Sequence, residues 1–294
     1  MADQHPSGID RLTGTATTGH VWDGIRELNN PLPRWWVWVF YATIVWAVGY
    51  WVVYPAWPLV SSYSAGMFGW HSRTSIVTDL DDLQKLRGAM AGKIAAAPLQ
   101  AIENDPEMLA FARAEAKPLF AENCAPCHGT GAAGAKGFPN LNDDDWLWGG
   151  TLDDVAQTIR HGARAADSQT RGPGGMPAFG RDGILKRDDI LTVAQFVRSL
   201  SGLPVEPGAD LATGQKIFAD NCAVCHGPGG KGNRALGAPN LTDAIWLYGS
   251  DAATIVEGLW NGRNGQMPAW ASRLDDTAIK SLAVYVHTLG GGEK

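Results

Sequence analysis

The sequence predicts a mainly α-helical protein, in which one N-terminal transmembrane helix precedes two tandem helical domains that are copies of each other. Two observations predict this fold class: an apolar run of 20 residues without a charge, and an internal repeat whose copies each contain one Cys-x-x-Cys-His motif. The 294 residues carry a formal net charge of −6. This acidic balance argues against a nucleic-acid partner, because nucleic acids are usually bound by a basic surface.

The apolar run extends from Trp35 to Tyr54. A helix of this length spans about 30 Å, the thickness of the hydrocarbon core of a bilayer. Aromatic residues crowd both ends, as in the interfacial belts of membrane proteins, and Pro55 and Pro58 end the helix. The alternatives are a core helix of a soluble protein and a cleavable signal peptide, which would be shorter and nearer the terminus. The run therefore predicts a membrane anchor.

Charge around the run indicates its orientation. Arg26 and Arg34 precede the run closely, whereas the first basic residue after it is Arg73. Basic residues are enriched on the cytoplasmic side of membrane helices, so a cytoplasmic N-terminus is favoured. The predicted boundaries are 1–34 for the N-terminal segment, 35–57 for the transmembrane helix and 58–107 for a connecting segment.

The rest of the chain repeats itself. Residues 120–129 match residues 218–227 at an offset of 98, and residues 176–179 match residues 267–270 at an offset of 91. The first copy has nine more residues before its methionine, in a polar loop that contains Gly and Arg. Each copy ends in an apolar helical pattern, and a linker rich in Pro and Gly lies between the copies. We therefore predict two domains, 108–203 and 208–291.

Both copies contain the attachment motif of c-type haem. The residues concerned are Cys124, Cys127 and His128 in the first copy, and Cys222, Cys225 and His226 in the second. Helical residues three apart share one face, so two thiols can reach the two vinyl groups of one porphyrin while the adjacent histidine offers a nitrogen to the iron. A zinc site would join two ligand pairs in one domain, and a thioredoxin-like pair would need a βαβ unit. The sequence thus predicts two covalently bound haem c groups, with their iron, in two tandem cytochrome c domains.

Met176 and Met267 are the predicted sixth ligands of the two irons. Each begins a Met-Pro-Ala-aromatic motif, 48 residues after His128 and 41 residues after His226. Flanking Gly and Pro favour a loop position, and a thioether ligand raises the reduction potential into the range of an electron carrier. His161 is an alternative to Met176 and would give a bis-histidine site. The sequence leaves open whether each methionine binds the haem of its own repeat or that of the other, because both arrangements have the same signature.

Other residues could support the haem groups. The carbonyl groups of Pro139 and Pro239 could accept the Nδ1 proton of the haem histidines and orient their rings. Five side chains could donate to haem propionates, with plain packing around the porphyrin as the alternative: Trp146, Trp148, Trp246, Tyr248 and Arg263. We expect His287 to face solvent, because Arg198 is the matching residue of the first copy.

The N-terminal segment points to one family. Residues 20–36 are HVWDGIRELNNPLPRWW, and the apolar run ends in Tyr54-Pro55. Followed by two haem motifs, this segment resembles the start of the dihaem subunit III (CcoP/FixP family) of cbb3-type cytochrome c oxidases, and the resemblance covers essentially the whole chain. Many cytochromes share the haem motifs, so the anchor motif carries the specificity.

The resemblance implies outer-sphere electron transfer, in which the haem groups supply the chemistry. Electrons would pass from a soluble cytochrome c or the quinol-oxidising complex to the catalytic haem–copper subunit, which reduces oxygen and pumps protons in aerobic or microaerobic respiration. A monohaem cytochrome subunit is a further expected partner. The resemblance also implies a single-pass protein of the bacterial inner membrane, with a cytoplasmic N-terminal segment and with the connecting segment and haem domains in the periplasm. A dihaem cytochrome c peroxidase and a tethered electron shuttle outside an oxidase are the alternatives.

Overall fold

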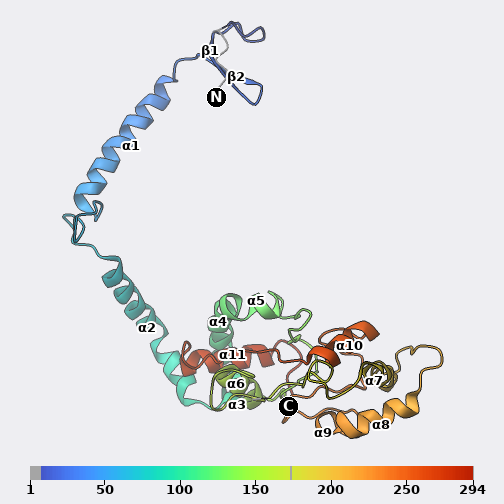
Figure 1. The fold of residues 1–294 in the computed structure, drawn as a ribbon. Coiled ribbons are helices and arrows are strands. Elements are labelled where there is room, and N and C mark those ends of the chain that lie inside the picture. Colours follow the sequence, from blue (N-terminus) through green and yellow to red (C-terminus); the bar gives the residue numbers. More distant parts are fainter. Residues whose placement is uncertain (1–7, 173, 294) are drawn as a thin grey trace. The chain divides into compact units, whose positions relative to one another are not determined.

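The computed structural model describes residues 8–172 and 174–293. They divide into two compact units, of which the first extends to Leu86 and the second begins at Arg87. The first unit contains the antiparallel strands β1 (Thr17–Trp22) and β2 (Ile25–Leu28) and the helix α1 (Arg34–Val53). Helix α2 (Ser72–Ala96) contributes to both units. The described residues are mainly helical, which confirms the predicted fold class (Figure 1).

Helix α1 is the one helix of the described residues that is long and apolar enough to cross a membrane. None of its residues is buried within the protein, unlike those of a core helix in a soluble protein. The helix ends at Val53 because Tyr54 adopts extended backbone ahead of Pro55, the conformation that a residue before proline prefers. The helical part of the predicted anchor is therefore the apolar run itself.

The second unit contains two sets of helices, one from each repeat. Helix α3 (Leu99–Asn104) precedes the first repeat, from which come α4 (Pro106–Asn123), α5 (Ala125–His128), α6 (Leu152–His161) and α7 (Arg187–Leu200). From the second come α8 (Leu211–Asn221), α9 (Ala223–His226), α10 (Ala252–Asn261) and α11 (Asp276–His287). The repeats are alike in local detail: α4 and α8 both begin at an aspartate, Asp105 and Asp210, whose carboxylate accepts hydrogen bonds from backbone N–H groups of the first turn.

The terminal helices of the two repeats are exchanged. Helix α11 of the second repeat packs on α4 and α6 of the first, whereas α7 of the first repeat packs on α8 and α10 of the second. Figure 1 shows α11 beside α4 and α6, and α7 beside α8 and α10. One aromatic contact occurs twice, between Phe120 and Tyr285 and between Phe218 and Phe196, with ring centroids 5.5 Å apart in both pairs. Since Phe120 matches Phe218 and Phe196 matches Tyr285, each pair joins the two repeats.

The exchange produces two hydrophobic cores that share no residue. We call the helices α3 to α6 with α11 the first body, and the helices α7 to α10 the second body. Leu282 of α11 is fully buried in the first core, and the matching Val193 of α7 is fully buried in the second. The second body is thus one continuous stretch of chain, inserted between the two parts of the first. The two domains predicted from the sequence, 108–203 and 208–291, stay predictions. The two cores do not follow these ranges, because each core combines helices of both repeats.

Candidate haem-binding sites

Each Cys-x-x-Cys-His motif forms one tight helical turn. Cys124 ends α4 and precedes the four-residue helix α5, and its carbonyl oxygen accepts the backbone N–H of His128 at 2.9 Å. Cys222 stands in the same relation to α8, α9 and His226, again with a 2.9 Å bond. The four cysteines are free of disulfides. One turn therefore presents two thiols and a histidine together, which is the geometry that attachment to a single porphyrin needs.

The two histidine rings are oriented by backbone carbonyl groups, as the sequence predicted. Nδ1 of His128 lies 3.0 Å from the oxygen of Pro139, and Nδ1 of His226 lies 3.0 Å from the oxygen of Pro239. A carbonyl oxygen only accepts, so Nδ1 carries the proton and Nε2 keeps its lone pair for a metal. Burial lowers the pKa of His226, against the opposing effect of the bond to Pro239, and this favours the neutral imidazole that binds iron.

The two methionine segments lie where the chain crosses between the bodies. The backbones of Met267 and Ala163 exchange hydrogen bonds of 2.9 and 3.0 Å, and those of Met176 and Arg263 exchange bonds of 2.9 and 3.2 Å. Gly262 has a positive φ of 76°, and a β-carbon there would lie 2.6 Å from the carbonyl oxygen of Met176. Only glycine allows this approach of the two backbones.

Each methionine packs on the core of the other repeat's haem motif. Met267 contacts the first core, where Cys124 also lies, and Met176 contacts the second core, which includes Cys222. Both methionines are half-buried in loops. The alternative left open by the sequence, a methionine exchanged between the repeats, is therefore the one that the packing favours.

The other histidines have different partners. Nδ1 of His161 lies 3.1 Å from a carboxylate oxygen of Asp167, in the loop unique to the first repeat. His287 does not face solvent as expected: its Nδ1 lies 2.6 Å from Glu103, its Nε2 lies 2.8 Å from the carbonyl oxygen of Glu293, and the side chain is 10% exposed. The expectation was wrong because α11 packs against α3, whereas residues 201–210 before α8 form no helix.

The tryptophans predicted near the propionates differ between the repeats. Trp146 donates its Nε1–H to the carbonyl oxygen of Gly291, so it is engaged within the protein. Nε1 of Trp246 is buried without a partner in the described part of the chain, although a buried indole N–H normally has one. Trp246 packs on the second core together with Met176. Its unpaired donor fits a haem propionate at the second site.

The extra loop of the first repeat contains a residue that sequence reasoning missed. Arg171 donates from Nη2 to the carbonyl oxygen of Asp154 at 3.1 Å, and Arg263 donates from Nη2 to that of the matching Thr254, also at 3.1 Å. Arg171 thus takes the position that Arg263 holds in the second repeat. Burial opposes ionisation of Asp154, but hydrogen bonds from Arg171 and Thr151 outweigh it and lower the pKa. Residue-by-residue alignment could not find Arg171, because the loop has no counterpart.

The donor sets fit haem rather than zinc. Each body offers a pair of thiols three residues apart, a histidine of the same motif with Nε2 free for a metal, and a loop methionine that packs on the core. Among the described residues, no group of three or more His, Cys, Asp or Glu is arranged to hold a metal ion, so the ligand set of a tetrahedral zinc site is not assembled there. The buried, unpaired Nε1 of Trp246 adds a donor for an anionic group.

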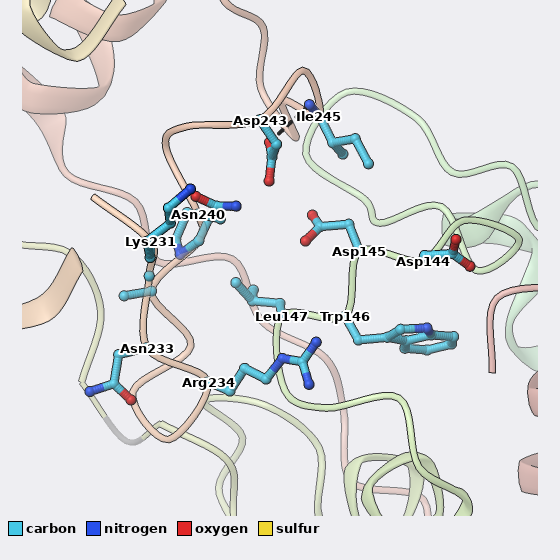
Figure 2. A pocket seen from close by; sticks show the side chains of 13 residues that line it. Asp144, Asp145, Trp146, Leu147, Lys231, Asn233, Arg234, Asn240, Asp243 and Ile245 are labelled. Carbon is cyan, nitrogen blue, oxygen red and sulfur yellow. Dashed lines mark hydrogen bonds between the residues drawn. The ribbon is translucent and has the colours of Figure 1, made fainter. Parts of the chain in front are cut away.

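A cavity of about 460 Å³ lies between loops of the two bodies. Figure 2 shows the carboxylates of Asp145 and Asp243 pointing into the same space, with Arg234 nearby. Burial raises the pKa of Asp145, and the negative charges of Asp243 and Asp143 raise it further, against a smaller effect of Arg234. Arg234 itself pairs with Glu293. The cavity is thus polar and adjoins the second haem motif, because its lining residues Gly232 and Pro239 both hydrogen-bond to His226.

Comparison with known families accounts for most of the chain. Residues 14–61 match the N-terminal domain of cytochrome oxidase-cbb3, FixP, residues 113–201 match cytochrome c, and residues 209–286 match cytochrome c oxidase, cbb3-type, subunit III. The cbb3-type cytochrome c oxidase subunit FixP of Bradyrhizobium diazoefficiens is 61% identical, over 98% of this chain and 99% of the relative. The chain belongs to the FixP/CcoP family of cbb3-type cytochrome c oxidase subunits.

More distant relatives agree over the same length. The CcoP subunit of Azospirillum brasilense is 51% identical over 97% of this chain and 98% of its own, and that of Cereibacter sphaeroides is 47% identical over 94% and 95%. The chain is therefore a cytochrome c subunit of a cbb3-type oxidase, carries covalent haem c and associates with other oxidase subunits. The resemblance inferred from the anchor motif is confirmed.

Proposed function

We propose that this subunit carries two haem c groups and transfers electrons from a periplasmic donor to the catalytic haem–copper subunit of its oxidase. The first group is held by Cys124, Cys127 and His128, and the second by Cys222, Cys225 and His226. The sixth ligands are exchanged: Met267 serves the first haem and Met176 the second. The single observation that carries this assignment is the packing of each methionine on the core that contains the other repeat's attachment motif.

When bound, haem c supplies a reversible one-electron change of its iron. The protein's own residues do the rest. The thiols fix the porphyrin edge, and the carbonyl groups of Pro139 and Pro239 hold the imidazoles with Nε2 toward the metal. The methionine thioethers would supply a further ligand to each iron, which would favour the reduced state and exclude exogenous ligands. With a histidine and a methionine both available to the iron, an electron carrier is favoured over a peroxidase, which needs an open or labile position.

The membrane arrangement follows from the first unit. Helix α1 supplies one span, and Arg26 and Arg34 before it support a cytoplasmic N-terminus. The haem-bearing unit then lies in the periplasm of a bacterium, on the inner membrane, where a soluble cytochrome c or the quinol-oxidising complex can deliver electrons. The catalytic haem–copper subunit and a monohaem cytochrome subunit are the proposed partners within the oxidase.

Replacement of the methionines tests the ligand assignment. Met176→Leu and Met267→Leu should each lower one reduction midpoint and slow oxidase turnover while both haem groups remain attached, because leucine offers no lone pair. The measurement is a potentiometric titration of the purified oxidase. Met108→Leu is the matched control, since Met108 also packs on the first core but lies on α4. Two unchanged midpoints in both test variants would refute the ligation.

A variant with one haem tests the exchange itself. With Cys222 and Cys225 replaced by alanine, only the first attachment motif remains. In this background Met267→Leu should lower the remaining midpoint, whereas Met176→Leu should leave it unchanged. The opposite result would mean that each methionine serves its own repeat. Co-purification with a copper-containing membrane subunit separates an oxidase subunit from a free tethered shuttle.

A further inference from the structure

Two aromatic side chains cross between the bodies in matching positions. Trp148 follows the first haem motif and Tyr248 the second, at an offset of 100. The ring of Tyr248 lies over Gly137, where an added β-carbon would be 3.2 Å from Cε1. The ring of Trp148 lies so close to Gly237 that no β-carbon would fit. Gly137 and Gly237 are themselves a matching pair, so each ring contacts the loop of the other body. We call these four residues the junction.

The loops contacted at the junction are those that orient the haem histidines. Gly137 stands two residues before Pro139, whose carbonyl oxygen accepts Nδ1–H of His128. Gly237 stands two residues before Pro239, which does the same for His226. Tyr248 of the second body therefore supports the loop that holds His128, and Trp148 of the first body supports the loop that holds His226.

Two arginines hold the rings in place. The guanidinium of Arg263 lies 4.3 Å from the ring centroid of Tyr248, and that of Arg164 lies 5.4 Å from that of Trp148. Both arginines also bond to backbone: Arg164 donates from Nε to the carbonyl oxygen of Gly265 at 2.6 Å, and Arg263 donates to that of Thr254. A guanidinium over an aromatic face is attractive, so each ring has a cation over it in addition to its contact with a glycine of the other body.

The first loop has one more bond across the junction. The backbone N–H of Gly137 donates to the carbonyl oxygen of Leu247 at 2.8 Å, next to Tyr248. Gly237 donates instead to Arg234 of its own loop, at 3.3 Å. The loop of His226 is instead tied to the first body by a side chain, because Arg234 pairs with Glu293, which follows α11.

We propose that Trp148 and Tyr248 are positioning residues that act across the junction, each on the axial histidine of the other body. The inference rests on the proposed ligation by His128 and His226. The bond from Nδ1–H to a carbonyl sets the orientation and basicity of the imidazole, and these tune the reduction potential of the metal it binds. Loss of the Trp148 ring should therefore shift the reduction potential of the haem in the second body, and loss of the Tyr248 ring that of the haem in the first body.

The test is a potentiometric titration of the holo-oxidase with each ring removed. Trp148→Leu should shift the midpoint that Met176→Leu also lowers, and leave the other midpoint near its wild-type value. Tyr248→Leu should shift the midpoint sensitive to Met267→Leu, and leave the other midpoint near its wild-type value. Leucine keeps apolar volume at the junction, so folding is favoured while the flat ring is lost.

Conservative variants separate positioning from plain stability. At these matching positions the first repeat has a tryptophan and the second a tyrosine. Either ring therefore suits the junction, and Trp148→Tyr and Tyr248→Trp should keep both midpoints near their wild-type values. A shift confined to the ring's own body, an equal shift of both midpoints, or no shift would overturn the proposal. If the methionine variants move no midpoint, the ligation has failed; if they move one each and the junction variants do not act across the bodies, only the junction inference has failed.

Discussion

Removing one buried side chain from α11 should loosen the first body although α11 belongs to the second repeat. Leu282 is 0% exposed and lies in the core formed with α4 and α6. A Leu→Ala change at a fully buried site costs about 3 kcal/mol, which raises the opening equilibrium about a hundredfold. The two cores share no residue, so the effect should stay within one body.

Hydrogen exchange followed by peptide mass spectrometry measures this directly. In Leu282→Ala, the amides of α4 and α6 should lose protection by about two orders of magnitude, whereas those of α8 and α10 should stay as in the wild type. The matched control is Val193→Ala, at the equivalent position of α7 and also 0% exposed. It should loosen α8 and α10 instead, by about 2 kcal/mol. Loss of protection in α8 and α10 after Leu282→Ala would refute the exchanged packing.

Two further outcomes are expected. Asp145→Asn should stabilise the second unit near neutral pH. In the folded protein the pKa of Asp145 is raised above its ordinary value of 3.8. The wild type therefore loses stability as the pH rises from about 3.8 through the folded-state pKa, because the carboxylate is then charged in the folded state. The gain over wild type in urea unfolding should be present at about pH 7 and vanish below the ordinary pKa. A gain at low pH only would contradict this account. Gly262→Ala should lower the free energy of unfolding by about 1–3 kcal/mol, because φ of residue 262 is +76° and the new Cβ would lie 2.6 Å from the carbonyl oxygen of Met176. Gly183→Ala is the control for backbone strain alone, because Gly183 has a φ of +70° and open space around it. Equal losses of stability in both variants would exclude a role for the contact with Met176.

Local chemistry was predictable from the sequence because it depends on neighbours in the chain. The helical turn of each attachment motif and the bond from His128 to Pro139 follow from spacings of a few residues, and the structure contains both. The apolar faces of α7 and α11 were also visible, since periodicity reveals which side of a helix is buried. The helix of the anchor ends at Val53, just ahead of Pro55, because a proline constrains the residue before it.

The choice of partner for each apolar face was not predictable. Phe120 would fit Phe196 of its own repeat as well as Tyr285 of the other, since both offer an aromatic ring at the same helical position. The sequence therefore left the exchange open, and packing over a separation of more than a hundred residues decided it. His287 shows the same limit: alignment with Arg198 indicated a surface position, whereas α3, which the second body lacks, covers it.

The discontinuous first body has a consequence for the order in which the protein matures. A chain emerges N-terminus first, so Cys124, Cys127 and His128 are synthesised well before α11. Helix α4 can then pack on α3, but it lacks α11, whose Tyr285 contacts Phe120, until the end of synthesis. The second body contains all its helices as soon as residue 262 has emerged. The attachment motif that is synthesised first thus belongs to the body that closes last, so its two thiols stay accessible until α11 is in place.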